Sequence, residues 1–122
     1  MSPKAVITGW GKCVPPVELT NQDLEKVMDT NDQWIFERTG IKSRRISHVE
    51  GTDLAELAAR RALACAGLEP EELDLIVVAS TTPELLCPSV AAMVQDRLGA
   101  VNAGTFDLNA ACSGFVYALD GC

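Results

Sequence analysis

The stretch GTFDLNAACSGFVYAL, residues 104–119, decides the fold class that this chain is expected to adopt. Residues 104–108 are predicted to form a strand, residues 110–114 a sharp turn of small side chains, and residues 115–119 the start of a helix. The run LIVVA at residues 75–79 is continuously apolar, as in a strand that is buried on both faces within a parallel sheet. Strands and helices in this order are typical of a parallel sheet covered by helices.

Two longer helices are predicted to cover such a sheet. Thr52 is expected to cap an alanine-rich helix that runs to about Ala66, with Gly67 as its stop. Ser89 is expected to cap a second helix that ends at Gly99. The alternation of strands and helices along the chain therefore indicates an α/β layered fold with a mainly parallel sheet.

The N-terminal part of the chain is predicted to add a strand and a helix. Residues 5–9 form a short apolar, partly β-branched run, which predicts a first strand. Thr20 is expected to cap a helix in which Val27 and Met28 lie at helical spacing on the apolar face. Residues 41–51 are polar and are expected to be irregular.

A second short helix is predicted between residues 30 and 40. Thr30 and Gln33 fit the capping-box pattern, and Gly40 is a plausible stop. Trp34 and Arg38 then share one face of this helix. An indole stacks on an adenine and a guanidinium binds phosphate, so this pair is a candidate nucleotide site. Taken alone, however, these residues favour a core tryptophan beside a solvated basic loop.

The composition excludes several classes of protein. The net charge of −7 argues against general nucleic-acid binding, because contacts to phosphates need a basic face. No uncharged apolar stretch is long enough to cross a bilayer, so no membrane association is expected. The first residues lack the apolar region of a secretory signal, and a cytoplasmic location is expected.

Five cysteines are spread widely along the chain, and no CxxC pair occurs. Because His48 is the single histidine, no structural zinc site is expected. Cys13 and Cys65 are expected to be small buried hydrophobic side chains.

Cys112 is the candidate nucleophile. It follows a predicted strand and precedes a predicted helix, where free backbone N–H groups and the helix dipole favour a thiolate and an oxyanion. Its small neighbours leave space for an acyl group, as an acyl-transfer nucleophile requires. A buried structural cysteine at a strand end is the alternative interpretation of the same pattern. Asp107 is expected to hydrogen-bond to the backbone of this turn.

Taken together, these segments resemble the N-terminal portion of β-ketoacyl-acyl-carrier-protein synthase III, a thiolase-fold condensing enzyme. The Trp-Ile-x-x-Arg-Thr-Gly-Ile string is specific within that superfamily, whereas the Ala-Ala-Cys-x-Gly-Phe turn is shared more widely. The matching segments are Ile7-Thr8-Gly9, Thr20-Asn21, Asp23-Leu24-Glu25-Lys26, Asp29-Thr30, Asp32, Trp34-Ile35, Arg38-Thr39-Gly40-Ile41, Leu75-Ile76-Val77-Val78-Ala79, Pro88-Ser89, and Asp107 through Cys112 to Phe115.

The resemblance implies a reaction and roles for residues. Cys112 would take an acyl group from acyl-CoA as a thioester, and the carbanion from decarboxylated malonyl-acyl-carrier protein would attack that thioester, which initiates fatty-acid synthesis. Trp34 matches the residue that stacks on the adenine of CoA, and Arg38 and Thr30 match residues of the nucleotide and phosphate site. The basic stretch through Arg45 would suit the approach of acidic acyl-carrier protein. No metal or bound redox cofactor is implied.

The resemblance also implies an incomplete site. Residues 1–122 would form an N-terminal half-domain, incomplete at its C-terminal end, because no stop signal precedes Cys122. Cys122 would be an interior helix residue. The decarboxylating histidine and asparagine, and one oxyanion-hole N–H, belong to the second half of the family's chain. The 122 residues alone are therefore expected to lack condensing activity.

Two further expectations concern a homodimer. Residues 103–108 would pair with their copy across a two-fold axis. Cys87 stands where better-known relatives often carry a phenylalanine that closes the partner's acyl pocket, so a roomier primer site is expected unless Leu85 or Leu86 fills the gap. Two alternatives remain open, namely an acyltransferase of secondary metabolism with the same fold and a non-catalytic half-domain that binds acyl-carrier protein or another chain.

Overall fold

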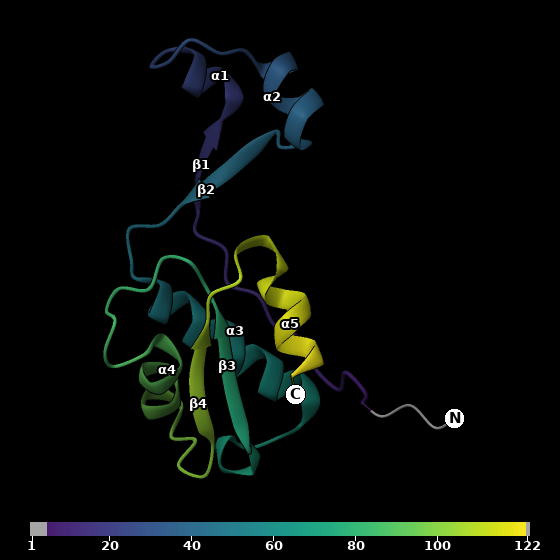
Figure 1. Cartoon of the computed structure of the whole chain (residues 1–122), viewed down its shortest axis with the longest axis vertical. Helices are drawn as coiled ribbons and strands as arrows, with labels where there is room; N and C mark the ends of the chain where they lie inside the picture. Colours follow the sequence, from purple (N-terminus) through teal and green to yellow (C-terminus); the bar gives the residue numbers. More distant parts are fainter. Residues whose placement is uncertain (1–4, 122) are drawn as a thin grey trace. The chain divides into compact units, whose positions relative to one another are not determined.

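The computed structural model describes residues 5–121, which form two compact units (Figure 1). One unit is Val14–Val49, and the other joins the segment up to Cys13 with the chain from Glu50 onward. The expectation that residues 1–122 form one half-domain stays a prediction. Cys122, expected inside a helix, lies outside the described residues.

The unit Val14–Val49 is built on a two-stranded antiparallel ribbon, in which Val17 pairs with Ile46 and Thr20 with Ser43. The expectation that residues 41–51 are irregular is therefore wrong. The second strand has the sequence SRRI, which lacks the alternation of apolar and polar residues that normally predicts a strand. The elements of this unit are β1 (Val17–Thr20), α1 (Asn21–Glu25), α2 (Asp32–Thr39) and β2 (Ser43–Ile46).

Helix α1 begins as predicted but is shorter than expected. Thr20 is its N-cap, and its side-chain oxygen accepts a hydrogen bond from the N–H of Asp23 at 3.2 Å. The helix ends at Glu25, and both Val27 and Met28 are exposed. Because these two side chains do not pack in a core, they contribute none of the burial that extends an amphipathic helix.

Helix α2 is capped one residue later than predicted. Asn31, not Thr30, is the N-cap, and its Oδ1 accepts a hydrogen bond from the N–H of Trp34 at 2.8 Å. Asparagine caps helices at least as well as threonine, which explains the shift. Gly40 ends the helix in the left-handed conformation with φ of 71°, as predicted.

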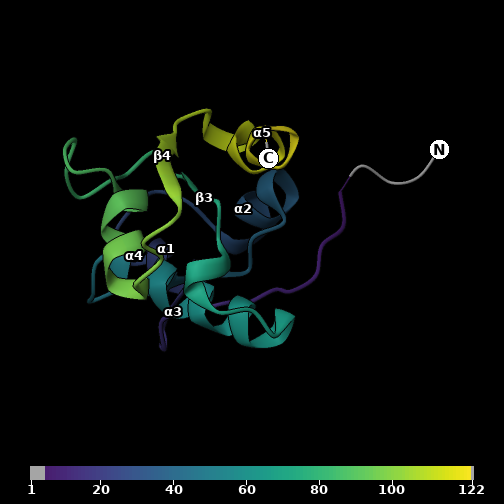
Figure 2. The same cartoon turned by 90° about the horizontal axis from the view of Figure 1, so that it is seen from below.

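The other unit contains the predicted parallel sheet. Its strands pair in register from Leu75 with Gly104 to Ala79 with Leu108. Helices α3 and α4 cover one face of this sheet and α5 the other (Figure 2). The α/β fold class is confirmed. The elements are α3 (Gly51–Ala66), η1 (Pro70–Glu72), β3 (Leu75–Ala79), α4 (Val90–Leu98), β4 (Gly104–Leu108), η2 (Ala111–Ser113) and α5 (Gly114–Asp120).

The core of this unit lies between the sheet and helices α3 and α4. Strand β3 is partly exposed instead of buried on both faces, because β4 is its one neighbour among the described residues. The predicted stops Gly67 and Gly99 are confirmed, and both adopt positive φ. The buried side chains of the core are Leu63, Val90, Val94, Leu98, Ala100 and Ala103.

Residues 5–9 do not form the predicted strand. A strand needs a neighbouring edge for its N–H and C=O groups, and within residues 5–121 no strand pairs with this segment. The segment instead runs close to α3, where an added Cβ on Gly9 would lie 2.9 Å from the backbone nitrogen of Ala66. Val6 and Ile7 are exposed.

Candidate active site

The turn that carries Cys112 is as sharp as the sequence predicts. Strand β4 ends at Leu108, a 3₁₀ turn spans Ala111–Ser113, and α5 begins at Gly114. Ala111 has φ of 45°, a left-handed conformation that alanine rarely adopts. Strain of this kind costs about 1–3 kcal/mol and is found most often at functional sites.

Gly114 lets α5 approach the end of β3. An added Cβ would lie 3.1 Å from the Cβ of Ala79 and 3.7 Å from Cδ2 of Leu108, and Gly114 itself is buried. A larger side chain would push the first turn of α5 away from the sheet. The small residue after Ser113 therefore fixes the position of the turn that bears Cys112.

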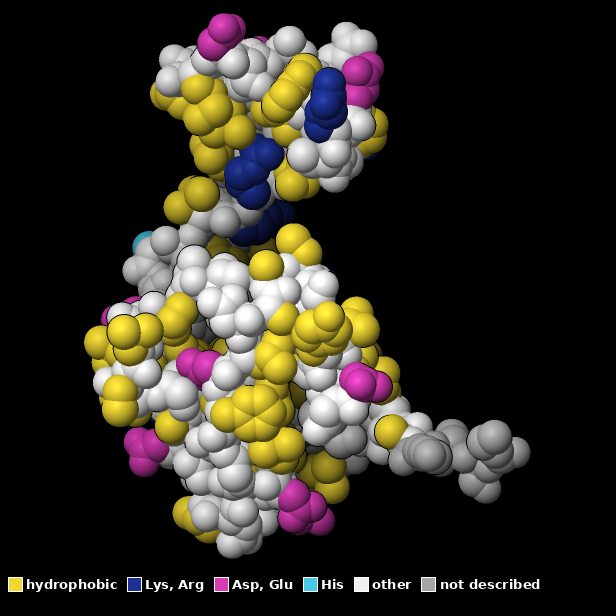
Figure 3. All heavy atoms as spheres, viewed as in Figure 1, with side chains coloured by type: hydrophobic (Ala, Val, Ile, Leu, Met, Phe, Trp, Pro, Cys, Tyr) yellow, Lys and Arg dark blue, Asp and Glu magenta, His cyan; other side chains and the backbone are white. Residues whose placement is uncertain are grey.

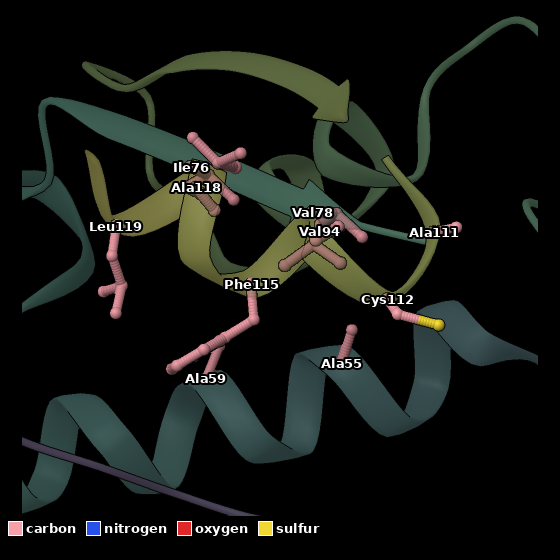
Figure 4. A pocket seen from close by; sticks show the side chains of 12 residues that line it. Ala55, Ala59, Ile76, Val78, Val94, Ala111, Cys112, Phe115, Ala118 and Leu119 are labelled. Carbon is pink, nitrogen blue, oxygen red and sulfur yellow. The ribbon is translucent and has the colours of Figure 1, made fainter. Parts of the chain in front are cut away.

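Cys112 lies at one end of an apolar cavity of about 640 Å³ that is lined by residues of α3, β3 and α5 (Figure 4). Figure 4 shows Cys112 at the end near Ala55 and Leu119 at the opposite end, with Phe115 pointing toward α3. Such a cavity can take an apolar acyl chain attached to the sulfur. The lining residues are Ala55, Ala59, Ile76, Val77, Val78, Ala79, Val94, Ala111, Cys112, Phe115, Ala118 and Leu119.

A second hollow of about 420 Å³ also borders Cys112. Besides Cys112 it is lined by Ala79, Ala111 and the hydroxyl-bearing residues Ser80, Thr81 and Thr82. Cys112 therefore borders both an apolar cavity and a smaller one that carries three hydroxyl groups. This arrangement suits an acyl chain and a polar leaving group, respectively.

Asp107 does not bind the backbone of the Cys112 turn, so that prediction is wrong. Its two carboxylate oxygens instead accept hydrogen bonds from the N–H groups of Val90 and Ala91, both at 2.8 Å. These N–H groups belong to the first turn of α4 and have no acceptor within the helix. The start of a helix therefore favours a carboxylate at this position. Asp107 thus joins the strand before Cys112 to α4.

Glu84 makes a contact with α3 that the sequence did not predict. Its Oε1 accepts a hydrogen bond from the N–H of Thr52 at 2.7 Å, and this contact lowers the pKa of Glu84 below its ordinary value of 4.5. The prediction that Thr52 caps α3 is wrong, because the N-cap of this helix is Glu50 and Thr52 lies within its first turn. The sequence signal that could have pointed to this contact is that Glu84 is the single charged residue between residues 80 and 89.

Cys87 is exposed on that same loop and lines neither cavity beside Cys112. Its expected role concerns a partner subunit and stays a prediction. Cys65 is exposed and Cys13 half-buried, so the expectation that both are buried is wrong. Cys65 lies off the face of α3 that includes Ala55, Ala59 and Leu63 and packs in the core.

Trp34 and Arg38 lie together in the unit Val14–Val49. The guanidinium carbon of Arg38 is 5.6 Å from the centroid of the Trp34 ring, a cation–π contact. Trp34 is 54% exposed, which contradicts a core tryptophan. Thr30 lies half-buried just before the helix. The indole and the guanidinium are thus presented together on α2.

The basic stretch after Arg38 is bound within its own unit. Nη1 of Arg44 donates to Oδ1 of Asn21 at 3.1 Å, and Arg45 donates to backbone carbonyls of the Pro15–Pro16 segment. Lys42 lies over the ring of Phe36 at 5.5 Å. Figure 3 shows Lys and Arg side chains gathered on this unit. The sequence did not predict that Asn21 would form these hydrogen bonds, because its partners are distant in sequence.

Within residues 5–121, no group of three or more His, Cys, Asp or Glu side chains is arranged to hold a metal ion. Over the same residues, none of the helices has the length and apolar character needed to span a membrane.

No protein-family model matches this chain, but curated proteins and solved structures that are named as β-ketoacyl synthases do. The chain is 57% identical over 116 residues to Beta-ketoacyl-[acyl-carrier-protein] synthase III 2 of Vibrio cholerae, covering 95% of this chain and 32% of the relative. The crystal structure of 3-oxoacyl-[acyl-carrier-protein] synthase III from Aquifex aeolicus VF5 is 53% identical with a TM-score of 0.88, over 93% of this chain and 37% of that one. The priming β-ketosynthase of the R1128 polyketide pathway is 41% identical with a TM-score of 0.85, over 93% and 34% of the two chains.

The fold is therefore that of the corresponding part of the thiolase-fold β-ketoacyl synthases. Within that class, the chain belongs to the β-ketoacyl-acyl-carrier-protein synthase III family, which confirms the resemblance. The chain spans about a third of the length of the curated relatives that it matches.

Proposed function

We propose that this chain carries the acyl-accepting part of a β-ketoacyl-acyl-carrier-protein synthase III. The observation that carries this proposal is Cys112, which is exposed on a strained turn and lies at one end of an apolar cavity of about 640 Å³. A nucleophile of acyl transfer needs access to the thioester carbonyl and room for the acyl chain. Both are present beside this sulfur.

The proposed reaction has two steps. The thiolate of Cys112 attacks the carbonyl carbon of acyl-CoA, a new S–C bond forms, and the S–C bond to CoA breaks as CoA leaves. Malonyl-acyl-carrier protein then loses CO₂, and the resulting carbanion attacks the Cys112 thioester to give 3-ketoacyl-acyl-carrier protein and release the thiolate. Because CO₂ loss supplies the carbanion, we propose no metal or bound cofactor. We also propose that the reaction takes place in the cytoplasm.

The proposed CoA site is on α2. Trp34 would stack on the adenine, and Arg38 and Thr30 would lie at the nucleotide and its phosphates. The exposure of Trp34 and its contact with Arg38 support this role, since a stacking ring must be accessible on one face. The neighbouring basic residues would favour the approach of acidic acyl-carrier protein.

The primer site is proposed to be roomier than in an acetyl-only enzyme, in a homodimer that pairs residues 103–108 with their copy. The small, exposed side chain of Cys87 supports this role. In the dimeric enzyme, Cys87→Phe is expected to shift the preference toward shorter primers, measured by competition between acetyl-CoA and longer acyl-CoAs. An unchanged preference would show that Leu85 or Leu86 limits the pocket instead.

The test of the whole function is reconstitution. The chain would be combined with the remaining two thirds of a synthase III relative and supplied with acetyl-CoA and malonyl-acyl-carrier protein. We expect 3-ketoacyl product from the combination, and none from the chain alone or from the Cys112→Ala combination. Turnover by the chain alone, or no product with a combination that assembles, would contradict the proposal.

A second candidate is a priming ketosynthase of secondary metabolism, which the R1128 similarity favours. It differs in primer and acceptor, so the same reconstitution with acyl-carrier proteins of fatty-acid and polyketide synthesis separates the two. Binding of acyl-carrier protein without any acylation of Cys112 would favour a non-catalytic half-domain.

A further inference from the structure

Asn21 is the fully buried polar side chain of the unit Val14–Val49, with 0% exposure. Its Nδ2 donates to Oδ1 of Asp32 at 2.7 Å and to the carbonyl oxygen of Ile41 at 2.8 Å. Its Oδ1 accepts from Nη1 of Arg44 at 3.1 Å. Its backbone N–H donates to the carbonyl oxygen of Lys42 at 3.3 Å. The hydrogen-bonding capacity of the amide is therefore used at both ends.

These partners bracket one helix. Asp32 is the first residue of α2, and Ile41 follows Gly40, the C-cap of that helix. Asn21 thus holds α2 at both ends through a single side chain, and Arg44 joins this contact to β2. Glu25 adds a second link at the start of the helix, because its Oε1 accepts from the N–H of Asp32 at 2.7 Å.

The partners also select asparagine. Two acceptors face one end of the side chain and an arginine faces the other, so the position requires two donor hydrogens and one acceptor oxygen. Aspartate has the same shape but lacks the donors, and it would place its charge beside Asp32. A buried group whose partners are lost costs more than the bond itself contributes.

We infer that Asn21 is a positioning residue for nucleotide recognition, which fixes the orientation of Trp34 and Arg38 by holding both ends of α2. This inference rests on the proposed function, in which those two residues bind CoA. Asn21 itself is buried and touches no substrate. Asn21 acts through the position of α2. It therefore affects the binding of the nucleotide and not the reaction of the thioester.

The test measures binding of CoA and of adenosine 3′,5′-bisphosphate through the fluorescence of Trp34, in a Trp10→Phe background that removes the other indole. Asn21→Asp is expected to weaken binding by about tenfold, because two hydrogen bonds are lost. Gln22→Glu is the matched control, since it makes the same amide-to-carboxylate change on an exposed neighbouring residue. Asp32→Ala, which removes one of the three side-chain bonds, is the second variant and should weaken binding less.

A second measurement separates positioning from general damage. Acetylation of Cys112 is followed with acetyl-CoA and with acetyl-pantetheine, which lacks the nucleotide. Asn21→Asp should slow the first reaction and leave the second unchanged. Equal slowing of both, or nucleotide affinity within about twofold of the Gln22→Glu control, would overturn the inference. If the Trp10→Phe chain does not bind nucleotide, or if Trp34→Ala leaves calorimetric binding unchanged, the proposed CoA site is wrong instead.

Discussion

Asp107 and Val90 are joined by a hydrogen bond of 2.8 Å from the backbone N–H of Val90 to the Oδ2 of Asp107. The other carboxylate oxygen binds the N–H of Ala91 at the same distance. One side chain on the strand that leads to Cys112 thus takes two free donors of helix α4. This contact joins β4, the strand that precedes Cys112, to α4.

Asp107→Ala is expected to destabilise the chain by about 1–2 kcal/mol, because two N–H groups at the start of α4 lose their acceptor. The free energy of unfolding, measured by urea titration, gives the size of the loss. Asp107→Asn is the matched control and keeps one acceptor oxygen, so it should lose less. Equal stability of the alanine variant and the unaltered chain would contradict this account of the contact.

Gly114→Ala is expected to displace the turn that bears Cys112. The new Cβ would lie 3.1 Å from the Cβ of Ala79, and overpacking of this kind costs about 1–3 kcal/mol. The unfolding free energy should fall, and the rate at which iodoacetamide labels Cys112 should change. Gly104→Ala is the control, because its Cβ would meet neighbours no closer than 3.6 Å. The contact is unimportant if the two variants behave alike.

Glu84 is expected to make the stability of the fold depend on pH. Its pKa is lowered in the folded chain by the N–H of Thr52, so its ionised form stabilises the fold above its ordinary pKa of 4.5. This contribution is lost as the pH falls through the lowered pKa. Glu84→Gln should therefore be less stable than the unaltered chain at neutral pH, with a difference that shrinks in acid.

Thermal unfolding of both chains between neutral pH and about pH 3 measures that difference. Asp53 also has a lowered pKa, which arises first from its hydrogen bond with Arg97, so both chains should lose stability in acid. The comparison with Glu84→Gln isolates the contribution of Glu84. A difference that stays constant with pH would mean that the charge of Glu84 contributes nothing.

Features of the fold that depend on neighbouring residues could be predicted from the sequence. Thr20, Gly40 and Gly67 act locally as a helix cap and helix stops, and all three predictions are confirmed. The apolar run 75–79 forms a strand and the turn at Cys112 forms as expected, although the strand is not buried on both faces. In each case the pattern lies within a few residues of the structure that it predicts.

Features that depend on distant partners could not be predicted. Residues 5–9 have the composition of a strand, but strand formation requires an edge that the composition does not reveal. The polar residues Asn21, Glu84 and Asp107 gain their importance from partners far along the chain. Likewise, the sequence pattern placed Trp34 beside Arg38, but it could not show that the indole is exposed.

The measurement that tests the central claim most directly is the site of acylation. The chain would be incubated with acetyl-CoA, weighed intact by mass spectrometry, digested and mapped peptide by peptide. The account predicts one acetyl group on Cys112, released by hydroxylamine as a thioester should be, and none on the Cys112→Ala variant. No acetyl group on Cys112, or an equal distribution over Cys13, Cys65 and Cys87, would contradict the assignment of Cys112 as the nucleophile.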